Sequence, residues 1–402
     1  MSKIILHIDL NAFFVRCEEI KNPSLEGKPV IIGGVGRAGI VSTCSYAARE
    51  KGASSGMPTY RALELCPNAI VLPVDFSLYK AKSQEFFTYL KRYTPIIEKA
   101  SIDECFADFT DVLKDKKDPK AFLKQMQLDL YKETKLKCSI GVAPTKFLAK
   151  MASDMKKPMG LTIIRRRDVR KMLDPLPIEA FFGIGKKTSP KLRQMGINTI
   201  GDLAKLVNQD DPEIKNKLGK FFFAIKDWIN GYGSDEVSTE PFDPKSVGHS
   251  VTLRVDATTV EELNDQIKEI CHWIEEDAIK SNKVGKAVQI VLKDNEFKTI
   301  NRSKQLPKTT NKWEEIYKVA HSLLVDTYDG RPTRLVGVTL QKLQNPHETM
   351  EQLSIFDNYD EIKEENATRL LIDELNRQMH SSVFKTAGEA LRENPNGFKR
   401  GK

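Results

Sequence analysis

The sequence lacks long apolar segments and has few residues of the kinds that hold zinc or form disulfides. No apolar run approaches the roughly 18 residues needed to cross a bilayer, and the first strand-like segment meets Asp9 too early for a signal peptide. The six cysteines form no CxxC pair, and the six histidines show no metal-ligand spacing. These absences argue against a membrane span, a zinc site and a disulfide framework. They favour a protein of the reducing cytoplasm.

The length and composition predict several folded domains, with charge distributed unevenly along the chain. A chain of 402 residues, 40% hydrophobic and 29% charged, is typical of about two to four globular domains. Residues 345–402 contain 8 basic and 11 acidic residues, which gives a net charge of −3. The rest of the chain contains 55 basic and 44 acidic residues, which gives a net charge of +11. A basic body suits a polyphosphate partner such as nucleic acid. Many proteins with no nucleic-acid role share this balance, so charge alone does not decide.

The first 166 residues alternate between strand and helix patterns. Strands are expected at 3–9, within 95–109 as a hairpin, and at 137–142, with helices at 76–94, 118–135 and 143–157. With residues 20–75 set aside as an insertion, the order is β-α-β-β-α-β. This order predicts a ferredoxin-like sheet, in which the first and third strands are antiparallel neighbours at the centre.

Three carboxylates should meet at one edge of that sheet. Asp9 ends the first strand, whereas Asp103 and Glu104 begin the third, inside the stretch "IIEKASIDECFADF". An isolated acidic pair is more typical of a solvated turn, which is the alternative reading. Three converging carboxylates repel one another strongly unless cations neutralise them. The sequence therefore predicts a divalent-metal site here.

Residues 167–235 turn helical and contain a glycine turn, "GIGKK". Gly183 and Gly185, followed by Lys186 and Lys187, are typical of a helix-hairpin-helix, whose turn amides face a nucleic-acid phosphate. A tight turn between two helices that binds nothing is the alternative.

The last third predicts a linker and a small α/β domain. Residues 236–245 carry two prolines and little apolar content, and strands separated by two helices follow over 246–344. Arg302 and Lys304 lie on one of these strands and would offer charge to a phosphate backbone. Singly, each could equally be an ordinary solvated side chain.

Five segments together carry a family resemblance. "HIDLNAFFVRCEE", "STCSYAAREKGASSGMP", "ASIDECFADFT", "GVAPTKFLAKMASDMKKPMG" and the GIG turn occur in this order. The set strongly resembles the Y-family of translesion DNA polymerases, in the DNA polymerase IV (DinB/UmuC-like) branch, over about residues 1–345. The resemblance implies an α+β multidomain fold. Its parts would be a palm at 1–166 with small fingers inserted at about 20–75, a thumb at 167–235, a linker at 236–245, a little finger at 246–344 and a tail at 345–402.

The resemblance also implies site residues. Asp9 and Asp103 would hold two Mg²⁺ ions, helped by the backbone carbonyl of Leu10, and Glu104 would complete the site beside a primer 3′-hydroxyl. Two metals suit in-line phosphoryl transfer, because one activates the hydroxyl and the other shields the leaving pyrophosphate.

Further positions would contact the incoming nucleotide. The residues matching the family's triphosphate contacts are Thr43, Tyr46, Arg49 and Lys157. Tyr46 and Arg49 are three apart and share a helix face, although Tyr46 could simply pack. The family's KPxG pattern selects Lys157 over its neighbour. Phe14 matches the steric gate that excludes a ribose 2′-hydroxyl, with the preceding phenylalanine left for packing.

The function expected from these features is low-fidelity, DNA-templated synthesis on primer-template DNA from dNTPs by a cytoplasmic monomer. No extra proofreading domain is visible in the sequence. A non-catalytic DNA-binding relative and a metal-dependent repair nuclease remain as alternatives, distinguished by primer extension and by cleavage without dNTPs.

The tail holds a short docking motif. "QLSIF" resembles the pentapeptide with which bacterial polymerases bind the sliding clamp, so Gln352 would bond at the pocket rim while Leu353, Ile355 and Phe356 fill an apolar groove. Packing of this segment on the protein's own surface is the alternative.

Overall fold

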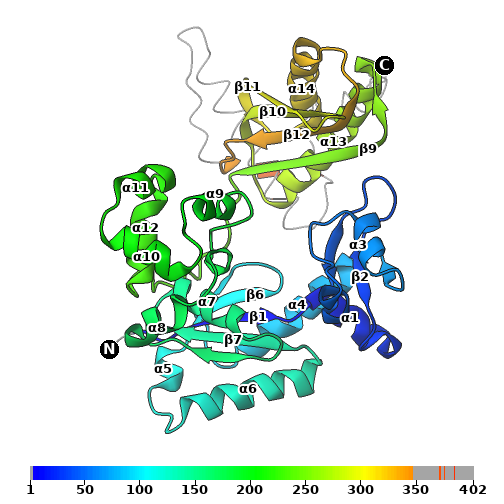
Figure 1. Ribbon diagram of the computed structural model, residues 1–402. Helices are drawn as coiled ribbons and strands as arrows, with labels where there is room; N and C mark the ends of the chain where they lie inside the picture. Colours follow the sequence, from blue (N-terminus) through cyan, green and yellow to red (C-terminus); the bar gives the residue numbers. More distant parts are fainter. Residues whose placement is uncertain (1–2, 347–370, 373–374, 376–383, 385–402) are drawn as a thin grey trace, which may run out of the picture. The chain divides into compact units, whose positions relative to one another are not determined.

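The computed structural model describes residues 3–346 together with residues 371, 372, 375 and 384. The chain divides into two compact units, Met1–Asp243 and Pro244–Lys402 (Figure 1). The predicted motif at 352–356 lies outside the described residues. Among the described residues, no helix is long and apolar enough to cross a membrane.

A five-stranded sheet forms the centre of the first unit. Its order is β5-β6-β1-β7-β8, and β1 pairs antiparallel with both of its neighbours. The strands are β1 (Ile5–Leu10), β5 (Ile97–Lys99), β6 (Glu104–Asp108), β7 (Cys138–Ala143) and β8 (Leu161–Ile163). The first four follow the ferredoxin-like plan expected from the sequence, and β8 extends the sheet in parallel beside β7.

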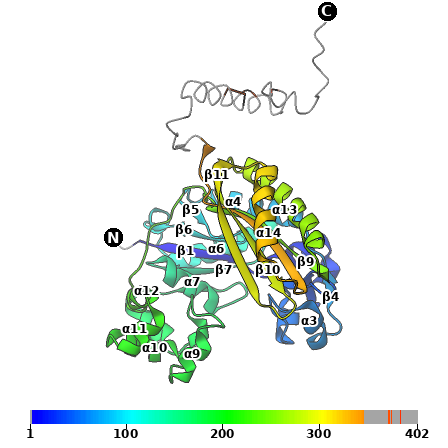
Figure 2. The ribbon, with the colours of Figure 1, turned by 90° about the horizontal axis from the view of Figure 1, so that it is seen from above.

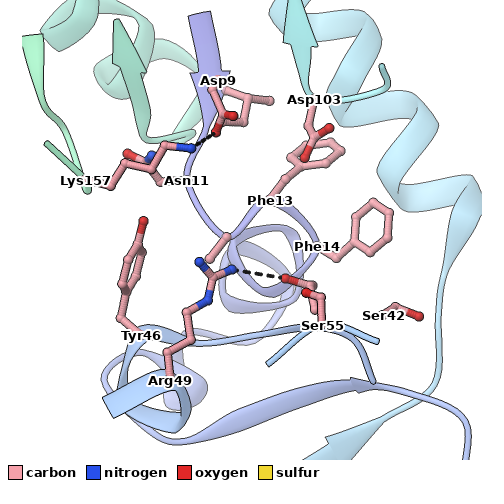
Figure 3. A pocket seen from close by; sticks show the side chains of 13 residues that line it. Asp9, Asn11, Phe13, Phe14, Ser42, Tyr46, Arg49, Ser55, Asp103 and Lys157 are labelled. Atoms are coloured by element: carbon pink, nitrogen blue, oxygen red, sulfur yellow. Dashed lines mark hydrogen bonds and ion pairs between the residues drawn. The ribbon is translucent and has the colours of Figure 1, made fainter. Parts of the chain in front are cut away.

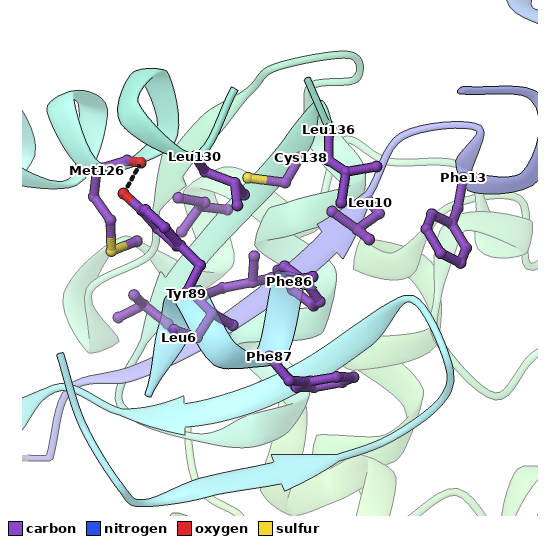
Figure 4. Packing of buried hydrophobic residues seen from close by; sticks show 14 of the residues in the cluster. Leu6, Leu10, Phe13, Phe86, Phe87, Tyr89, Met126, Leu130, Leu136 and Cys138 are labelled. Atoms are coloured by element: carbon purple, nitrogen blue, oxygen red, sulfur yellow. Dashed lines mark hydrogen bonds between the residues drawn. The ribbon is translucent and has the colours of Figure 1, made fainter. Parts of the chain in front are cut away.

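Helices cover both faces of this sheet. The helices of this region are α1 (Phe13–Lys21), α4 (Phe76–Leu90), α5 (Thr110–Leu113), α6 (Pro119–Thr134) and α7 (Lys146–Met155), with a 3-10 turn η1 (Pro23–Leu25). Leu6, Ile8 and Leu10 of β1 enter a core shared with α4 and α6, where the Tyr89 hydroxyl donates to the carbonyl of Met126 at 2.8 Å (Figure 4). Because strand side chains alternate, the odd-numbered residues of β1 face the opposite side, where α7 lies.

The segment expected as an insertion forms a small sheet of its own. It contains β2 (Val30–Gly33), β3 (Val41–Cys44), β4 (Ile70–Leu72), α2 (Tyr46–Glu50) and α3 (Thr59–Leu65), with the sheet order β3-β2-β4. Its separate core is small and includes Ile31, Val41 and Cys44. The hydroxyl of Ser45 accepts from the Ala48 amide and so fixes the start of α2.

Short helices complete the first unit. They are η2 (Arg166–Asp168), α8 (Val169–Leu173), η3 (Ile178–Ala180), α9 (Ser189–Gln194), α10 (Ile200–Asn208), α11 (Pro212–Leu218) and α12 (Phe221–Ile229). They share a core with α7, and the ring of Phe147 on α7 stacks on Trp228 of α12 at 4.5 Å. Thr199 and Asp202 form a capping box at the start of α10.

The second unit is a four-stranded antiparallel sheet packed against two helices (Figure 2). The sheet order is β11-β10-β12-β9, with β9 (Ser246–Ala257), β10 (Gly285–Asp294), β11 (Thr299–Thr310) and β12 (Thr333–Gln341). The helices α13 (Val260–Lys280) and α14 (Trp313–Thr327) share its core. The strands and helices agree with the pattern expected from the sequence.

Candidate active site

The sheet register brings the predicted carboxylates together. Asp9 on β1 lies directly opposite Glu104 on β6, and the backbone amide of Leu10 donates to the carbonyl of Asp103 at 2.9 Å. Residues far apart in sequence therefore meet at one edge of the sheet, as the antiparallel arrangement requires. The side chains of Asp9 and Glu104 are mostly buried, with 16% and 26% of their surfaces exposed.

Glu104 is held by groups on the α7 side of the sheet. The Lys150 ammonium lies 2.7 Å from Oε2 of Glu104 and 3.4 Å from Oδ2 of Asp9. The buried His7 places Nε2 at 3.4 Å from the same Glu104 oxygen, and its Nδ1 bonds Ser153 Oγ at 2.8 Å. His7 and Lys150 hold the pKa of Glu104 well below its usual range, because both favour the carboxylate over the acid.

Asp103 has the opposite electrostatic setting. Burial, together with the charges of Asp9 and Glu104, raises the pKa of Asp103, although the Ser101 hydroxyl donates to its carboxylate and opposes this shift. Crowded carboxylates of this kind are stabilised by a divalent cation, and carboxylate oxygens are the ligands that hard cations prefer. Ligand atoms of His7, Asp9 and Glu104 lie within 4.8 Å of one another. The cluster of His7, Asp9 and Glu104 fits a metal site, and Asp103 is not part of that cluster.

A pocket of about 330 Å³ opens beside the carboxylates (Figure 3). Its lining residues predicted from the sequence are Asp9, Leu10, Phe14, Thr43, Tyr46, Arg49, Asp103 and Lys157. Asn11, Ala12, Ser42 and Ser55 also line it and were not predicted, and so does Phe13, which the sequence analysis assigns to packing. Glu104 is not among the lining residues, because its carboxylate is turned toward α7.

Lys157 reaches the carboxylates from the loop after α7. Its ammonium lies 3.0 Å from Oδ1 of Asp9 and 2.8 Å from Oδ1 of Asp154. Burial opposes its charge, but Asp9 and Asp154 outweigh that effect and raise the pKa of Lys157. The Asn11 side chain fixes this loop by accepting from the Met159 amide at 2.8 Å. Lys157, which the resemblance assigns to the triphosphate, therefore lies at the wall of the pocket.

The opposite wall of the pocket comes from the inserted sheet. The Arg49 guanidinium lies 5.1 Å over the ring of Tyr46 and donates to Thr43 Oγ1 at 3.4 Å, so the predicted helix face is formed. The Tyr46 hydroxyl is buried and has no hydrogen-bond partner among the described residues. Burial also raises the pKa of Tyr46. A buried hydroxyl at a pocket wall is a donor for a ligand oxygen.

The glycine turn and the basic strand lie elsewhere in the fold. Gly183 has a φ of 98°, a conformation that favours glycine, and the Gly185 carbonyl accepts from the amide of Ser189 at the start of α9. Lys186 and Lys187 are exposed just before this helix. In the second unit, Arg302 and Lys304 are exposed on β11, in register with Ile290 and Val288 of β10.

Lys150 and His7 are the groups that the sequence reasoning missed. Lys150 lies four residues from both Lys146 and Asp154 on α7, a spacing that places all three on one helix face. His7 lies two residues before Asp9, on the same face of the strand. These two spacings are the features of the sequence that could have identified Lys150 and His7.

Family models match three parts of the chain. The impB/mucB/samB family matches residues 8–154, the IMS family HHH motif matches residues 166–197, and the impB/mucB/samB family C-terminal domain matches residues 244–355. The HHH match falls on the glycine turn for which a helix-hairpin-helix was expected.

Full-length relatives and solved structures agree with these matches. DNA polymerase IV of Oceanobacillus iheyensis is 40% identical over 385 residues, covering 95% of this chain and 91% of the relative. DNA polymerase IV of Bacillus velezensis is 38% identical over 386 residues, covering 95% and 92%. A solved Y-family DNA polymerase chimera of Dbh and Dpo4 is 28% identical, with a TM-score of 0.75 over 85% of this chain and 99% of that chain.

The fold and the matches together define the class of protein, an enzyme that polymerises nucleotides. The chain belongs to the Y-family of DNA-directed DNA polymerases, in the DNA polymerase IV branch. The resemblance and the multidomain α+β fold predicted from the sequence are therefore confirmed. Y-family DNA polymerases are metal-dependent, and this chain has a candidate acidic metal-binding cluster.

Proposed function

We propose that this chain adds dNTPs to the 3′-hydroxyl of a primer on template DNA, with low fidelity, and continues past damaged template bases. The observation that carries the proposal is the pocket, which has carboxylates of Asp9 and Asp103 on one wall and Tyr46 and Arg49 on the other (Figure 3). A triphosphate needs cations and donors at one end and metal-binding oxygens near its reacting phosphorus. The pocket supplies both.

The triphosphate would lie between α2 and the start of α1. Arg49 and Lys157 supply positive charge, and the buried hydroxyl of Tyr46 supplies a donor. Ala12, with a φ of 45°, precedes α1 and provides no side-chain cap, so the first amides of the helix are available to an anion. Thr43, which accepts from Arg49, would keep that guanidinium directed along the pocket wall.

Asp9, Asp103 and Glu104, with the backbone carbonyl of Leu10, would hold two Mg²⁺ ions. Bound there, Mg²⁺ would lower the pKa of the primer hydroxyl and neutralise the triphosphate and the departing pyrophosphate. The residues themselves position the reactants: Asp9 and Asp103 present oxygens to the pocket, and Glu104 stands beside them. Phe14, on the pocket floor, would exclude a ribose 2′-hydroxyl.

Each part of the chain would have its own role in synthesis. Residues 1–166 would be the palm with fingers inserted at about 20–75, residues 167–235 the thumb, and 246–344 the little finger beyond a linker at 236–245. The small core of the inserted sheet suits loose inspection of base-pair shape, which trades fidelity for tolerance of lesions. Gly183, Gly185 and the lysines after them would contact phosphates, as would Arg302 and Lys304. The tail would bind the sliding clamp, and the enzyme would act as a cytoplasmic monomer.

Primer extension opposite a panel of template lesions tests the proposal. Each of the four dNTPs is supplied singly with Mg²⁺ and then with EDTA. We expect incorporation opposite several lesions, frequent misincorporation opposite normal bases, and no product in EDTA. Cleavage of DNA without dNTPs would instead indicate a nuclease, and DNA binding without extension would indicate a non-catalytic scaffold.

A further inference from the structure

Lys150 contacts two of the proposed metal-binding carboxylates at once, those of Asp9 and Glu104. Its side chain is 13% exposed and lies within 4 Å of three acids, at 2.7 Å from Glu104, 3.4 Å from Asp9 and 3.7 Å from Asp154. One ammonium therefore bridges the two strands that carry Asp9 and Glu104.

The backbone of α7 packs directly against β7 of the sheet. A Cβ at Gly141 of β7 would collide with the carbonyl oxygen of Ala149 and the amide nitrogen of Ser153, so helix and strand are in direct backbone contact. Ser153 also bonds His7. The Lys150 ammonium can leave the carboxylates without any movement of α7, because the lysine side chain turns on four methylene groups.

The bridge has a consequence for Glu104. This carboxylate points to Lys150 and His7 and does not line the pocket, whereas Asp9 and Asp103 do. The Lys150 ammonium offsets part of the negative charge of Asp9 and Glu104, and Lys157, which lies 3.0 Å from Asp9, offsets more of it. A divalent cation that takes oxygens of both Asp9 and Glu104 must compete with the ammonium for the same lone pairs.

We propose that Lys150 is a positioning residue that pairs with Glu104 and Asp9 in the metal-free enzyme and gives up Glu104 when a divalent cation binds. This inference rests on the proposed metal-binding role of these acids. Lys150 thereby reduces the repulsion between the carboxylates and stabilises the metal-free enzyme. It also lowers the affinity of the enzyme for metal, because Glu104 can bind the metal only after it leaves Lys150.

Mn²⁺ binding to the full chain, measured by EPR without DNA or nucleotide, tests the inference. Lys150→Met should lower the Kd for Mn²⁺ by about tenfold. Lys146→Met, on the same helix but paired with Glu98, should change it by less than about twofold. In EDTA, Lys150→Met should melt at a lower temperature than wild type, and saturating Mn²⁺ should raise its melting temperature by more. Lys150→Gln should behave similarly and serves if the methionine variant folds poorly.

Two outcomes separate the possible failures. If Lys150→Met and Lys150→Gln bind Mn²⁺ no more tightly than Lys146→Met, Lys150 does not compete with metal and the inference is wrong, even if Asp9→Asn weakens binding. If Asp9→Asn binds Mn²⁺ as well as wild type does, the metal lies elsewhere, and the proposed metal site is wrong along with the inference.

Discussion

The ring of Phe14 stacks on the ring of Tyr79, with centroids 4.2 Å apart and planes inclined by only 9°. Tyr79 is fully buried, and its hydroxyl donates to Oε1 of Glu18 at 2.8 Å. The stacking leaves Phe14 little freedom to turn away from the pocket that it lines. A ring held in this way can act as a fixed steric barrier to the sugar.

Phe14→Ala should therefore raise incorporation of ribonucleotides relative to deoxynucleotides by about tenfold or more. Single-nucleotide kinetics with paired dNTP and rNTP substrates measure this ratio. Phe13→Ala is the comparison: Phe13 also borders the pocket but is 2% exposed and packs in the core, so its truncation should lower stability by about 3–5 kcal/mol while sugar selectivity stays unchanged. If Phe13→Ala loses selectivity and Phe14→Ala keeps it, the assignment is off by one residue.

Asp103→Ala or Glu104→Ala should lower the rate of primer extension by about 10³-fold or more, because each removes a carboxylate from the metal-binding edge of the sheet. DNA affinity should persist, since phosphate contacts are expected from other parts of the chain. Asp111→Ala, an exposed acid on α5, is the matched control and should extend primers normally. Extension at the wild-type rate by either Asp103→Ala or Glu104→Ala would rule out the proposed site.

Replacing both Lys186 and Lys187 with Ala should weaken DNA binding to all sequences alike. The slope of log K against log salt should become shallower by about 0.9 for each phosphate that the variant no longer neutralises. Fluorescence anisotropy at several salt concentrations measures the slope. Lys205→Ala removes an exposed lysine from α10 in the same helical region and should leave the slope unchanged. An unchanged slope in the double variant would favour a turn that binds nothing.

Leu353 and Phe356 belong to the predicted clamp-binding motif. Changing both to Ala should leave synthesis on short primers intact, because the described residues that line the pocket are unchanged. Clamp-stimulated synthesis on long templates should fall sharply, since the variant has no apolar anchors at these two positions. Stimulation that survives in full would mean that the segment packs on the protein itself.

Glu98 joins the central sheet to Ser238, in the segment 236–245 that is expected to be a linker. Its carboxylate accepts from the Ser238 amide at 2.8 Å and from the Lys146 ammonium at 2.9 Å and 3.0 Å. Glu98→Ala should speed hydrogen exchange at the Ser238 amide by about tenfold or more, because it removes a hydrogen bond to a charged group. Glu98→Gln keeps an acceptor and should show a smaller change. Equal exchange rates in Glu98→Ala and wild type would show that other contacts hold the linker.

Much of the fold could be predicted from the sequence because its patterns are local. The alternating strands and periodic helices of residues 3–166 identify a ferredoxin-like order, and that order alone implies that Asp9 meets Glu104. The parallel addition of β8 was not expected, because a three-residue strand carries too little pattern to be distinguished from a loop.

Within the site, the sequence by itself determined which residue types gather at the sheet edge, since strand register and motif spacing depend on the order of residues along the chain. Only the tertiary structure decided which of those side chains face the pocket and which contact other groups. It turns Glu104 toward Lys150 and His7, leaves Asp9 and Asp103 at the pocket, and leaves the Tyr46 hydroxyl without a partner among the described residues. These contacts depend on how closely α7 and α2 approach the strands, and close approach is set by packing between elements that are distant in sequence.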